Sequence, residues 1–419
     1  MEHTRTEPPA TRAEGLRRLE AFVANAGRAY AATRNEDRGP DDRNNVSTLS
    51  PYVRHRLVTE EDVLRAVLAR HSRTSAFKFV QEVFWRTYWK GWLESRPLVW
   101  SDYRAALDVR ISAANADAEL RGCLDAAYEG RTGIDAFDAW SRELVETNYL
   151  HNHARMWFAS VWIFTLRLPW ELGADLFMRH LLCGDPASNT LSWRWVAGLQ
   201  TRGKTYLARP SNIARYTLGR FPATSGLATE APPLPGPSYE PQPLPALTTE
   251  LSARAPALLV LHDDDLGVES LAIDSRDIRV TMAFEATAQR SPSGVAPNVA
   301  RFTGAALRDA LDRSPGQTIL LDGAADVEQS ARRIGDIARE HRVSRVIAPY
   351  APVGPTSEVL EPLRDALTAR GLEVVTLARR YDALSWPHAN RGFFGLGKAI
   401  PRVLDRLDVG PVERDLACS

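Results

Sequence analysis

Apolar side chains recur every three or four positions through the first half of the chain, which is the spacing of amphipathic helices. The pattern predicts helices over residues 14–26, 60–70, 75–94, 133–146, 151–166 and 170–182. Prolines separate several of these segments, at Pro51, Pro97, Pro169 and Pro186. We therefore predict a mainly all-α domain over residues 1–223.

The pattern changes after residue 223, where repeated prolines in 224–256 predict a semi-rigid extended linker. Beyond the linker, short apolar runs alternate with helical patterns. The predicted strands are 257–261, 280–284, 318–321, 345–347 and 373–377, and the predicted helices are 300–312, 327–341 and 356–370. Such alternation implies a parallel sheet. We predict a C-terminal α/β doubly wound, Rossmann-like domain over residues 257–419, and thus a multidomain protein.

Composition narrows the protein class. Apolar residues make up 44% of the 419 residues, which is ordinary for a globular protein, and no apolar run is long enough for a membrane span. Three widely spaced cysteines, Cys123, Cys183 and Cys418, suit a reducing cytoplasm and give neither a disulfide framework nor a zinc pattern. The net charge is zero, but the helical half is slightly basic and therefore compatible with a polyanionic partner.

A polar turn followed by tryptophans stands where the last helix of the first half should begin. Asp185 and Ser188 can cap this helix, and Asn189 and Trp193 then fall four positions apart on one face. Such a face offers a planar ligand a hydrogen-bonding amide beside an electron-rich ring.

A second candidate face lies in the predicted helix 75–94. Glu82, Trp85, Arg86 and Trp89 have the spacing of one helical face. An acid and a base beside an indole on one face are unusual for a helix stripe that packs into a core. The alternative is a Glu–Arg surface pair with Trp85 in the core.

A third face lies at the start of the predicted helix 151–166, where Asn152, Arg155 and Met156 share one side. His151 and His153 are two positions apart and point to different faces, so no metal site is predicted.

A hydroxyl cluster precedes Pro51 near the N-terminus. Ser47, Thr48 and Ser50 lead into a helix, and hydroxyls with free backbone N–H groups can hold a pyrophosphate. Simple helix capping is the alternative.

Taken together, these segments resemble the flavin-binding helical domain of the photolyase/cryptochrome family, in the same order. The resemblance implies a photolyase-type FAD-binding domain. It assigns FAD contacts to Tyr30, Ser47, Thr48, Leu49, Ser50, Arg86, Arg155, Asp185 and Asn189. It assigns the lesion pocket to Glu82, Trp85, Asn152, Met156 and Trp195, and electron transfer to Trp193 and Trp170.

The order of the two halves differs from the family, in which the α/β domain comes first. The segments Asp263–Leu266 and Asn390–Phe394 resemble the opening and the end of the family's antenna domain, which implies a circular permutation. The stretch 350–355, where the family has an acidic antenna-binding residue, is filled by small and apolar residues. The antenna chromophore is therefore expected to be absent or altered.

This sequence departs from the family pattern at a few positions. Val46 replaces a hydroxyl, His153 replaces an arginine, and Cys183 replaces the aspartate that the family pairs with the equivalent of Arg155. A buried arginine that lacks its carboxylate partner destabilises the folded protein by about 3 kcal/mol unless another group pairs with it. A distal tryptophan is also absent around Asp117, and the sequence leaves Trp100, Trp157 and Trp162 as candidates to replace it.

The resemblance implies a light-dependent photolyase-like lyase that splits cyclobutane pyrimidine dimers by electron transfer from reduced flavin. The expected partner is UV-damaged DNA, bound without sequence specificity by a monomer in the bacterial cytoplasm. The first alternative is a cryptochrome-like blue-light receptor, and the second is a flavin-free nucleic-acid-binding or scaffold protein. His151 leaves the (6-4) lesion open as a substrate.

Overall fold

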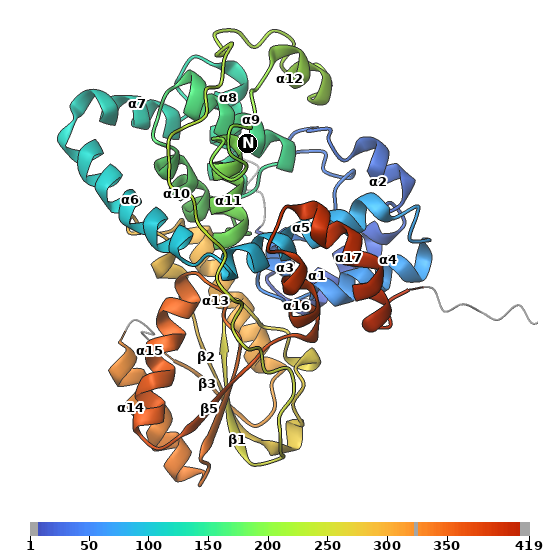
Figure 1. Ribbon diagram of the computed structural model, residues 1–419, viewed down its shortest axis with the longest axis vertical. Coiled ribbons are helices and arrows are strands. Elements are labelled where there is room, and N and C mark those ends of the chain that lie inside the picture. The colour runs from blue at the N-terminus through green and yellow to red at the C-terminus, as the bar shows by residue number, and fades with distance from the viewer. Residues whose placement is uncertain (1–6, 322–325, 411–419) are drawn as a thin grey trace, which may run out of the picture.

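The structure, a computed structural model, describes residues 7–321 and 326–410, so Cys418 lies outside the described residues. Figure 1 shows a helical half joined to an α/β half that contains one sheet. The helices of the first half are α1 (Arg12–Val23), α2 (Arg28–Thr33), α3 (Ser50–Arg54), α4 (Glu60–Arg70), α5 (Phe77–Glu94), α6 (Leu98–Ala116), α7 (Ala118–Tyr128), α8 (Asp135–Thr147), α9 (Asn152–Ser160), α10 (Trp170–His180), α11 (Pro186–Val196) and α12 (Pro210–Tyr216).

Most helices of the first half were predicted, but the stretch 151–166 is not one regular helix. It consists of α9 followed by a short π-helix, η1 (Val161–Thr165). Such π-turns reorient the side chains that follow them and are frequent at functional sites. The helices α6 and α7 were not predicted.

The second half contains β1 (Ala257–His262), β2 (Ile278–Phe284), α13 (Pro297–Asp312), β3 (Gln317–Leu320), α14 (Val327–Glu340), β4 (Arg345–Pro349), α15 (Pro355–Ala369), β5 (Glu373–Leu377), α16 (Arg380–Ser385) and α17 (Phe393–Arg406), with short 3₁₀ turns between them. The strands are parallel in the order β3-β2-β1-β4-β5. This confirms the predicted α/β doubly wound fold.

The two faces of the sheet belong to different cores, because alternate residues of a strand point to opposite sides. Leu258 and Val260 of β1 pack with α14 and α15. Leu259 and Leu261 belong instead to a core that includes α13, α1, α4 and α5. A third core lies within α6–α11.

The C-terminal helices return to the helical half. In Figure 1, α16 and α17 lie against α5, and the core formed by α1, α4 and α5 also contains Leu396, Ile400 and Val403 of α17. The division at 1–223, 224–256 and 257–419 therefore stays a prediction, because one core is built from both sides of the linker.

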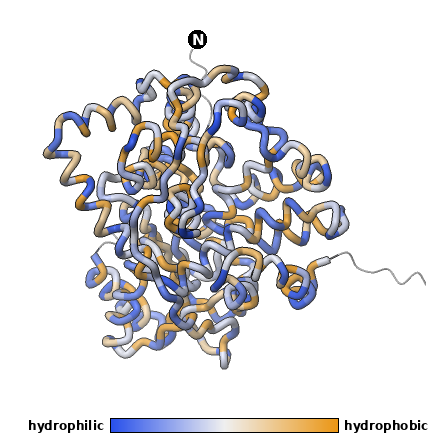
Figure 2. The backbone as a smooth tube through the Cα atoms, turned by 45° about the horizontal axis from the view of Figure 1, so that its top comes forward, coloured by the Kyte–Doolittle hydropathy of each residue, from blue (hydrophilic) through white to orange (hydrophobic). Residues whose placement is uncertain are grey.

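The Pro-rich segment lacks helices and runs along the helical half toward the sheet (Figure 1). Gln242 N–H donates to the carbonyl of Ser95 (2.7 Å), and Arg96 donates to the carbonyl of Tyr239 (3.1 Å). Thr248 then bridges to Leu377 at the end of β5. Figure 2 shows hydrophobic and hydrophilic positions mixed along the chain, and no described helix is long and apolar enough to cross a bilayer.

Candidate functional site

A crevice of about 190 Å³ brings together several residues that the sequence singled out. Its lining comes from α2, the segment before α3, α5 and the start of α9. The predicted site residues along it are Tyr30, Ser47, Thr48, Leu49, Ser50, Glu82, Asn152 and Arg155, together with Arg34, Tyr149, His151 and His153. Segments more than a hundred residues apart thus meet at one polar site.

The hydroxyl cluster forms a tight turn at the edge of the crevice. Thr48 has φ of 50°, in the left-handed region that non-glycine residues rarely adopt. Its hydroxyl accepts a hydrogen bond from Arg18 (3.3 Å), while Leu49 N–H donates weakly to the Ser47 hydroxyl (3.4 Å). This turn presents Ser47 and Thr48 to the cavities on both of its sides.

Glu82 is held by a cation of the same crevice. Arg34 donates to its carboxylate in a short contact. Burial still raises the pKa of Glu82 above its ordinary value, despite the opposing effect of Arg34. A base that is to hydrogen-bond Glu82 must therefore compete with Arg34.

Arg155 has found a partner to replace the missing aspartate. Its guanidinium donates to the carbonyl of Leu150 (3.0 Å) and to Cys183 Sγ (3.2 Å). Burial alone would raise the pKa of the Cys183 thiol, but Arg155 and the Ser50 hydroxyl bring it below its ordinary value. The Cys183 sulfur thus takes the place of the aspartate as an acceptor for Arg155.

The start of α11 lies deeper in the protein, and its polar side chains Asp185 and Asn189 pair with other groups of the chain. Asp185 caps the helix by accepting from Ser188 N–H (2.8 Å), and its other oxygen pairs with Arg86 (3.1 Å) and Lys90 (3.7 Å). Burial opposes ionisation, but these cations hold the pKa of Asp185 well below its usual range. The Asn189 amide donates to the carbonyl of Ala174 (2.8 Å).

Asp185, Arg86 and Asn189 do not line the crevice. Asn189 is 8% exposed, so the contact between its amide and a flavin ring stays a prediction.

The indole of Trp85 is covered by the C-terminal segment. Phe393, at the start of α17, stacks on it with centroids 3.7 Å apart and planes inclined by 7°. Tyr88 and Trp89 pack against the same ring, at 5.5 Å each. The proposed base-stacking wall is therefore occupied by an aromatic ring of the same chain.

Other predicted lesion-pocket residues lie outside the crevice lining. Trp195 stacks on Tyr206 at 5.7 Å, and the Tyr206 hydroxyl contacts His153 (3.3 Å), which does line it. Met156 is partly buried on α9. Trp193 and Trp170 are both buried in the core of α6–α11.

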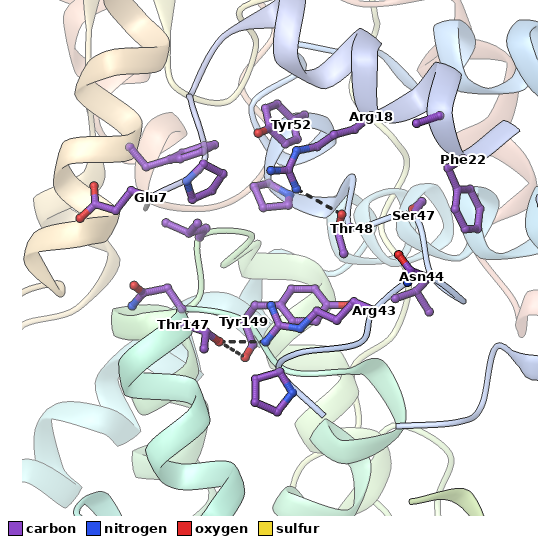
Figure 3. Close-up of a pocket in the computed structure, with 18 of the residues that line it drawn as sticks. Glu7, Arg18, Phe22, Arg43, Asn44, Ser47, Thr48, Tyr52, Thr147 and Tyr149 are labelled. Atoms are coloured by element: carbon purple, nitrogen blue, oxygen red, sulfur yellow. Dashed lines mark hydrogen bonds between the residues drawn. The ribbon is translucent and has the colours of Figure 1, made fainter. Parts of the chain in front are cut away.

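A larger cavity of about 680 Å³ adjoins the crevice across the turn formed by Val46, Ser47 and Thr48. Figure 3 shows Arg18 reaching Thr48 and Arg43 beside Tyr149. The Arg43 guanidinium lies 4.3 Å from the Tyr149 ring centre and pairs with Glu143 (2.9 Å).

The sequence reasoning gave Arg34 no role and missed Arg18 and Arg43. Only Arg34 carried a signal, since it stands four positions after Tyr30 on a helix. Arg18 and Arg43 look like ordinary surface arginines in the sequence.

No group of three or more His, Cys, Asp or Glu side chains suited to a metal occurs in residues 7–321 and 326–410. The acidic run after β1 faces arginines instead. Asp264 pairs with Arg54, and Asp265 pairs with Arg56 (3.1 Å) and with Arg379.

The segment expected to carry an antenna residue contacts the helical half. The Tyr350 hydroxyl and Val353 N–H both donate to Glu94, at 2.6 Å each. Gly354 lies against Pro186, where a Cβ atom would approach to 2.8 Å.

The comparisons with known proteins agree with the helical geometry. Residues 79–217 match the family model described as the FAD binding domain of DNA photolyase. A deoxyribodipyrimidine photo-lyase of Streptomyces griseus is 34% identical over 157 residues, which is 37% of this chain and 33% of that protein. Residues 79–217 of this chain are therefore similar to the FAD-binding domain of DNA photolyases.

Further relatives include both kinds of family member. A deoxyribodipyrimidine photo-lyase of Thermus thermophilus is 34% identical over 195 residues, covering 45% of this chain and 43% of that protein. A cryptochrome DASH of Oryza sativa is 27% identical over 235 residues, which is 52% of this chain and 38% of that protein. A solved class III photolyase from Agrobacterium tumefaciens has a TM-score of 0.42 at 25% identity. The match covers 50% of this chain and 44% of that photolyase. The chain spans between about a third and less than half of the length of the curated relatives that it matches.

The donor set of the crevice fits the phosphate end of a flavin dinucleotide, because it offers hydroxyls of Ser47, Thr48 and Ser50 beside the guanidinium groups of Arg34 and Arg155. The volume of the crevice, about 190 Å³, is smaller than the roughly 300–1,000 Å³ that is usual for ligand sites. The volume of the adjoining cavity, about 680 Å³, lies within that range. A dinucleotide therefore needs more room than the crevice alone offers.

Proposed function

We propose that this protein binds FAD across the crevice and the adjoining cavity of about 680 Å³, and that it repairs cyclobutane pyrimidine dimers in UV-damaged DNA by light-driven electron transfer. The observation that supports it best is the meeting of Ser47–Ser50, Glu82, Asn152 and Arg155 at one site within a helical half whose residues 79–217 are similar to the FAD-binding domain of DNA photolyases. Relatives named deoxyribodipyrimidine photo-lyase favour the repair reaction.

Different residues of the crevice would contact different parts of the cofactor. The hydroxyls of Ser47, Thr48 and Ser50 would donate to phosphate oxygens, and Arg34 would add positive charge. Arg155, fixed by the Leu150 carbonyl, is oriented before the ligand arrives. When bound, the flavin supplies a photoexcitable one-electron carrier.

The lesion would be recognised by the face of α5. Trp85 would stack on a flipped base and Glu82 would accept hydrogen bonds from its edge. Both residues first need release, Trp85 from Phe393 and Glu82 from Arg34. Substrate binding is therefore coupled to movement of α17.

The test is a repair assay with the purified, flavin-loaded protein and an oligonucleotide that contains one dimer. Under blue light with reduced flavin, we expect the dimer to be split. Glu82→Ala should lose most repair, because it removes the edge-reading acceptor, and its flavin content is measured in parallel because Glu82 also holds Arg34. Intact dimers with the flavin-loaded wild type would rule out the repair reaction.

A second candidate is a cryptochrome-like photoreceptor, and the Phe393–Trp85 stack favours it. A contact inside the chain that covers the lesion wall can change with the state of a flavin without any substrate. This candidate predicts light-dependent protease sensitivity of α17 in a protein that leaves dimers intact.

The order of the two halves also supports a proposal. We infer that the chain is a circular permutation of the family architecture, with residues 257–410 corresponding to the antenna-type domain. Joining residues 257–410 ahead of residues 7–223 by a flexible linker should give a folded, flavin-binding protein. An unfolded product would argue against this correspondence.

We further propose that the protein is a monomer that acts on DNA in the bacterial cytoplasm. The expected result in size-exclusion chromatography is a single monomeric peak.

A further inference from the structure

A groove of about 650 Å³ lies on the helical half and shares no lining residue with the crevice or its adjoining cavity. One wall is a continuous stretch of chain that runs from the π-turn η1 through a tight turn into the start of α10. The other wall comes from the Pro-rich segment, between residues 228 and 234. The volume of the groove lies within the roughly 300–1,000 Å³ that is usual for small-molecule sites.

Backbone contacts hold both walls in place. Ala228 N–H donates to the Thr165 hydroxyl (3.0 Å), which joins the Pro-rich segment to η1. Leu234 N–H donates to the carbonyl of Ala197 (3.0 Å) at the end of α11. The tight turn contains Arg167, whose φ of 56° lies in the left-handed region that non-glycine residues rarely adopt. The walls are therefore formed before a ligand arrives, and both π-turns and strained backbone are frequent at functional sites.

Most of the lining of the groove is apolar. It includes side chains of η1, the turn, α10 and the Pro-rich segment, namely Ile163, Phe164, Leu168, Trp170 and Leu234. The ring of Trp170 also packs against Tyr103, with centroids 5.6 Å apart, so its position is fixed by the core. An apolar body, aromatic or aliphatic, fits this lining because it leaves water on binding there.

One carboxylate interrupts the apolar lining. Glu171 of α10 lines the groove and is only 6% exposed. Among the described residues, its Oε2 atom has no hydrogen-bond partner. Its ion pair is with Arg110, whose Nε lies 3.6 Å from Oε2, which is longer than a hydrogen bond. A buried carboxylate that lacks hydrogen bonds is unfavourable, so Glu171 favours a cationic N–H donor beside it.

Arg110 can give way to such a donor. It belongs to α6, and its side chain is 49% exposed, so it has solvent to turn into. A surface guanidinium at this distance contributes little to stability. Because Oε2 of Glu171 is enclosed, a ligand cation has to take the position that Arg110 now holds.

We propose that this groove binds a small cationic ligand that has an apolar body and one primary ammonium or amidinium group. The body lies against Phe164, Leu168 and Leu234, and the cationic group donates to the Glu171 carboxylate in place of Arg110. Since the groove is separate from the crevice and its adjoining cavity, the ligand binds whether or not the protein holds a flavin.

The first experiment is calorimetric titration of the full-length protein with phenethylamine, which carries an ammonium group on an apolar body, and with its anionic counterpart 3-phenylpropionate. We expect saturable binding of phenethylamine, and weaker binding of 3-phenylpropionate. Glu171→Gln keeps the shape of the side chain and removes its charge. It should weaken phenethylamine binding by about tenfold or more, which corresponds to one charged hydrogen bond.

The matched control is Glu230→Gln, which removes an exposed carboxylate that lines the same groove. It should change the affinity for phenethylamine by less than about twofold, because an exposed charge is well screened. The same titrations in the presence of saturating FAD should give the same affinities, so failure of flavin binding leaves this test intact.

Arg110→Gln is an independent test that remains informative if Glu171→Gln fails to fold. It removes the cation that competes for Glu171, so phenethylamine binding should become tighter by about two- to fivefold. Unchanged or weaker binding in this variant would show that the Glu171–Arg110 pair is only structural and would overturn the proposal. Absence of saturable phenethylamine binding by the wild type, equal binding of 3-phenylpropionate, or wild-type affinity in Glu171→Gln would overturn it as well.

Discussion

Arginines are abundant both in the crevice and at the interface between the two halves, but the two regions use them differently. At the interface, Arg54 and Arg56 are 1% and 2% exposed and are enclosed by carboxylates from distant parts of the chain. In the crevice, Arg34 and Arg155 line open space and remain accessible to a ligand. The interface fixes how the halves sit together, whereas the crevice arginines, although Arg34 pairs with Glu82 and Arg155 with Cys183, also face open space that an anion can enter.

The largest expected effect is on the interface. Arg56 pairs with Glu60 (3.2 Å), Asp265 (3.1 Å) and Asp382 (2.6 Å). Arg56→Ala therefore removes the arginine paired with buried Asp382, while Glu60 keeps Arg86 and Asp265 keeps Arg379. Removing one partner of a buried pair costs about 3–5 kcal/mol. We expect the free energy of unfolding in urea to fall by about that amount.

The control for this change is Arg339→Ala, whose surface pair with Asp336 is mostly exposed. It should leave the unfolding midpoint unchanged. Equal effects of the two substitutions would contradict the contrast between enclosed and exposed arginines.

A second test addresses the cover over the crevice side of α5. Phe393→Ala removes the ring stacked on Trp85, and truncation of a buried phenylalanine costs about 3 kcal/mol. The same change uncovers the indole, so binding of single-stranded DNA should become tighter, as measured by fluorescence anisotropy. Phe394→Ala is the matched control, because Phe394 is 86% exposed, and should change neither quantity. Weaker DNA binding in Phe393→Ala would show that the stack is not a cover.

A third test uses pH at the contact between the halves. Burial raises the pKa of Glu94 to about 7 from its ordinary 4.5. The folded protein therefore binds this proton more tightly, so the stability contributed by neutral Glu94 is complete below pH 4.5 and is lost as the pH rises to about 7. The loss is about 3 kcal/mol.

Glu94→Gln should remove this dependence. The measurement is the difference in unfolding free energy between wild type and variant at pH 4.5 and at pH 7, the two ends of the titration range of Glu94. A difference that stays constant over this range would mean that Glu94 is ionised in the folded protein.

The smallest effect concerns the packing of the two indoles. Gly173→Ala forces a methyl group into Trp193 and Trp162, and overpacking of a core costs about 1–3 kcal/mol. Gly122→Ala is the opposite case, because Gly122 lies within α7 with no atom near its added Cβ. It should raise stability by about 0.5–1 kcal/mol. The measurement is the thermal unfolding midpoint of Gly173→Ala and of Gly122→Ala, each compared with the wild type.

The sequence predicted the elements whose signal is local. The strands 257–261 and 373–377 were recognisable because short apolar runs lie between turns, and Asp185 was recognisable as a cap because the residues that it caps follow it directly. The helices α6 and α7 were missed because their alanine-rich stretches bury few residues and give weak periodicity.

The interface could not be predicted, for a physical reason. Arg54 and Asp264 are 210 residues apart, and nothing local in either segment indicates the other. The same holds for Phe393 and Trp85, which meet only because α17 returns to α5. For site residues that depend on such contacts, the sequence indicates the residue type but not the neighbours that it meets in the fold.

The central claim is that the crevice beside Ser47–Ser50 holds a flavin, and FAD stoichiometry tests it most directly. Purified wild-type protein, reconstituted with FAD and desalted, should retain about one flavin per chain by its visible absorption spectrum. The Ser47→Ala/Ser50→Ala double variant should lose most of it, whereas Ser101→Ala, an exposed position on α6, should not. A colourless wild-type protein, or equal flavin content in all three, would contradict the account.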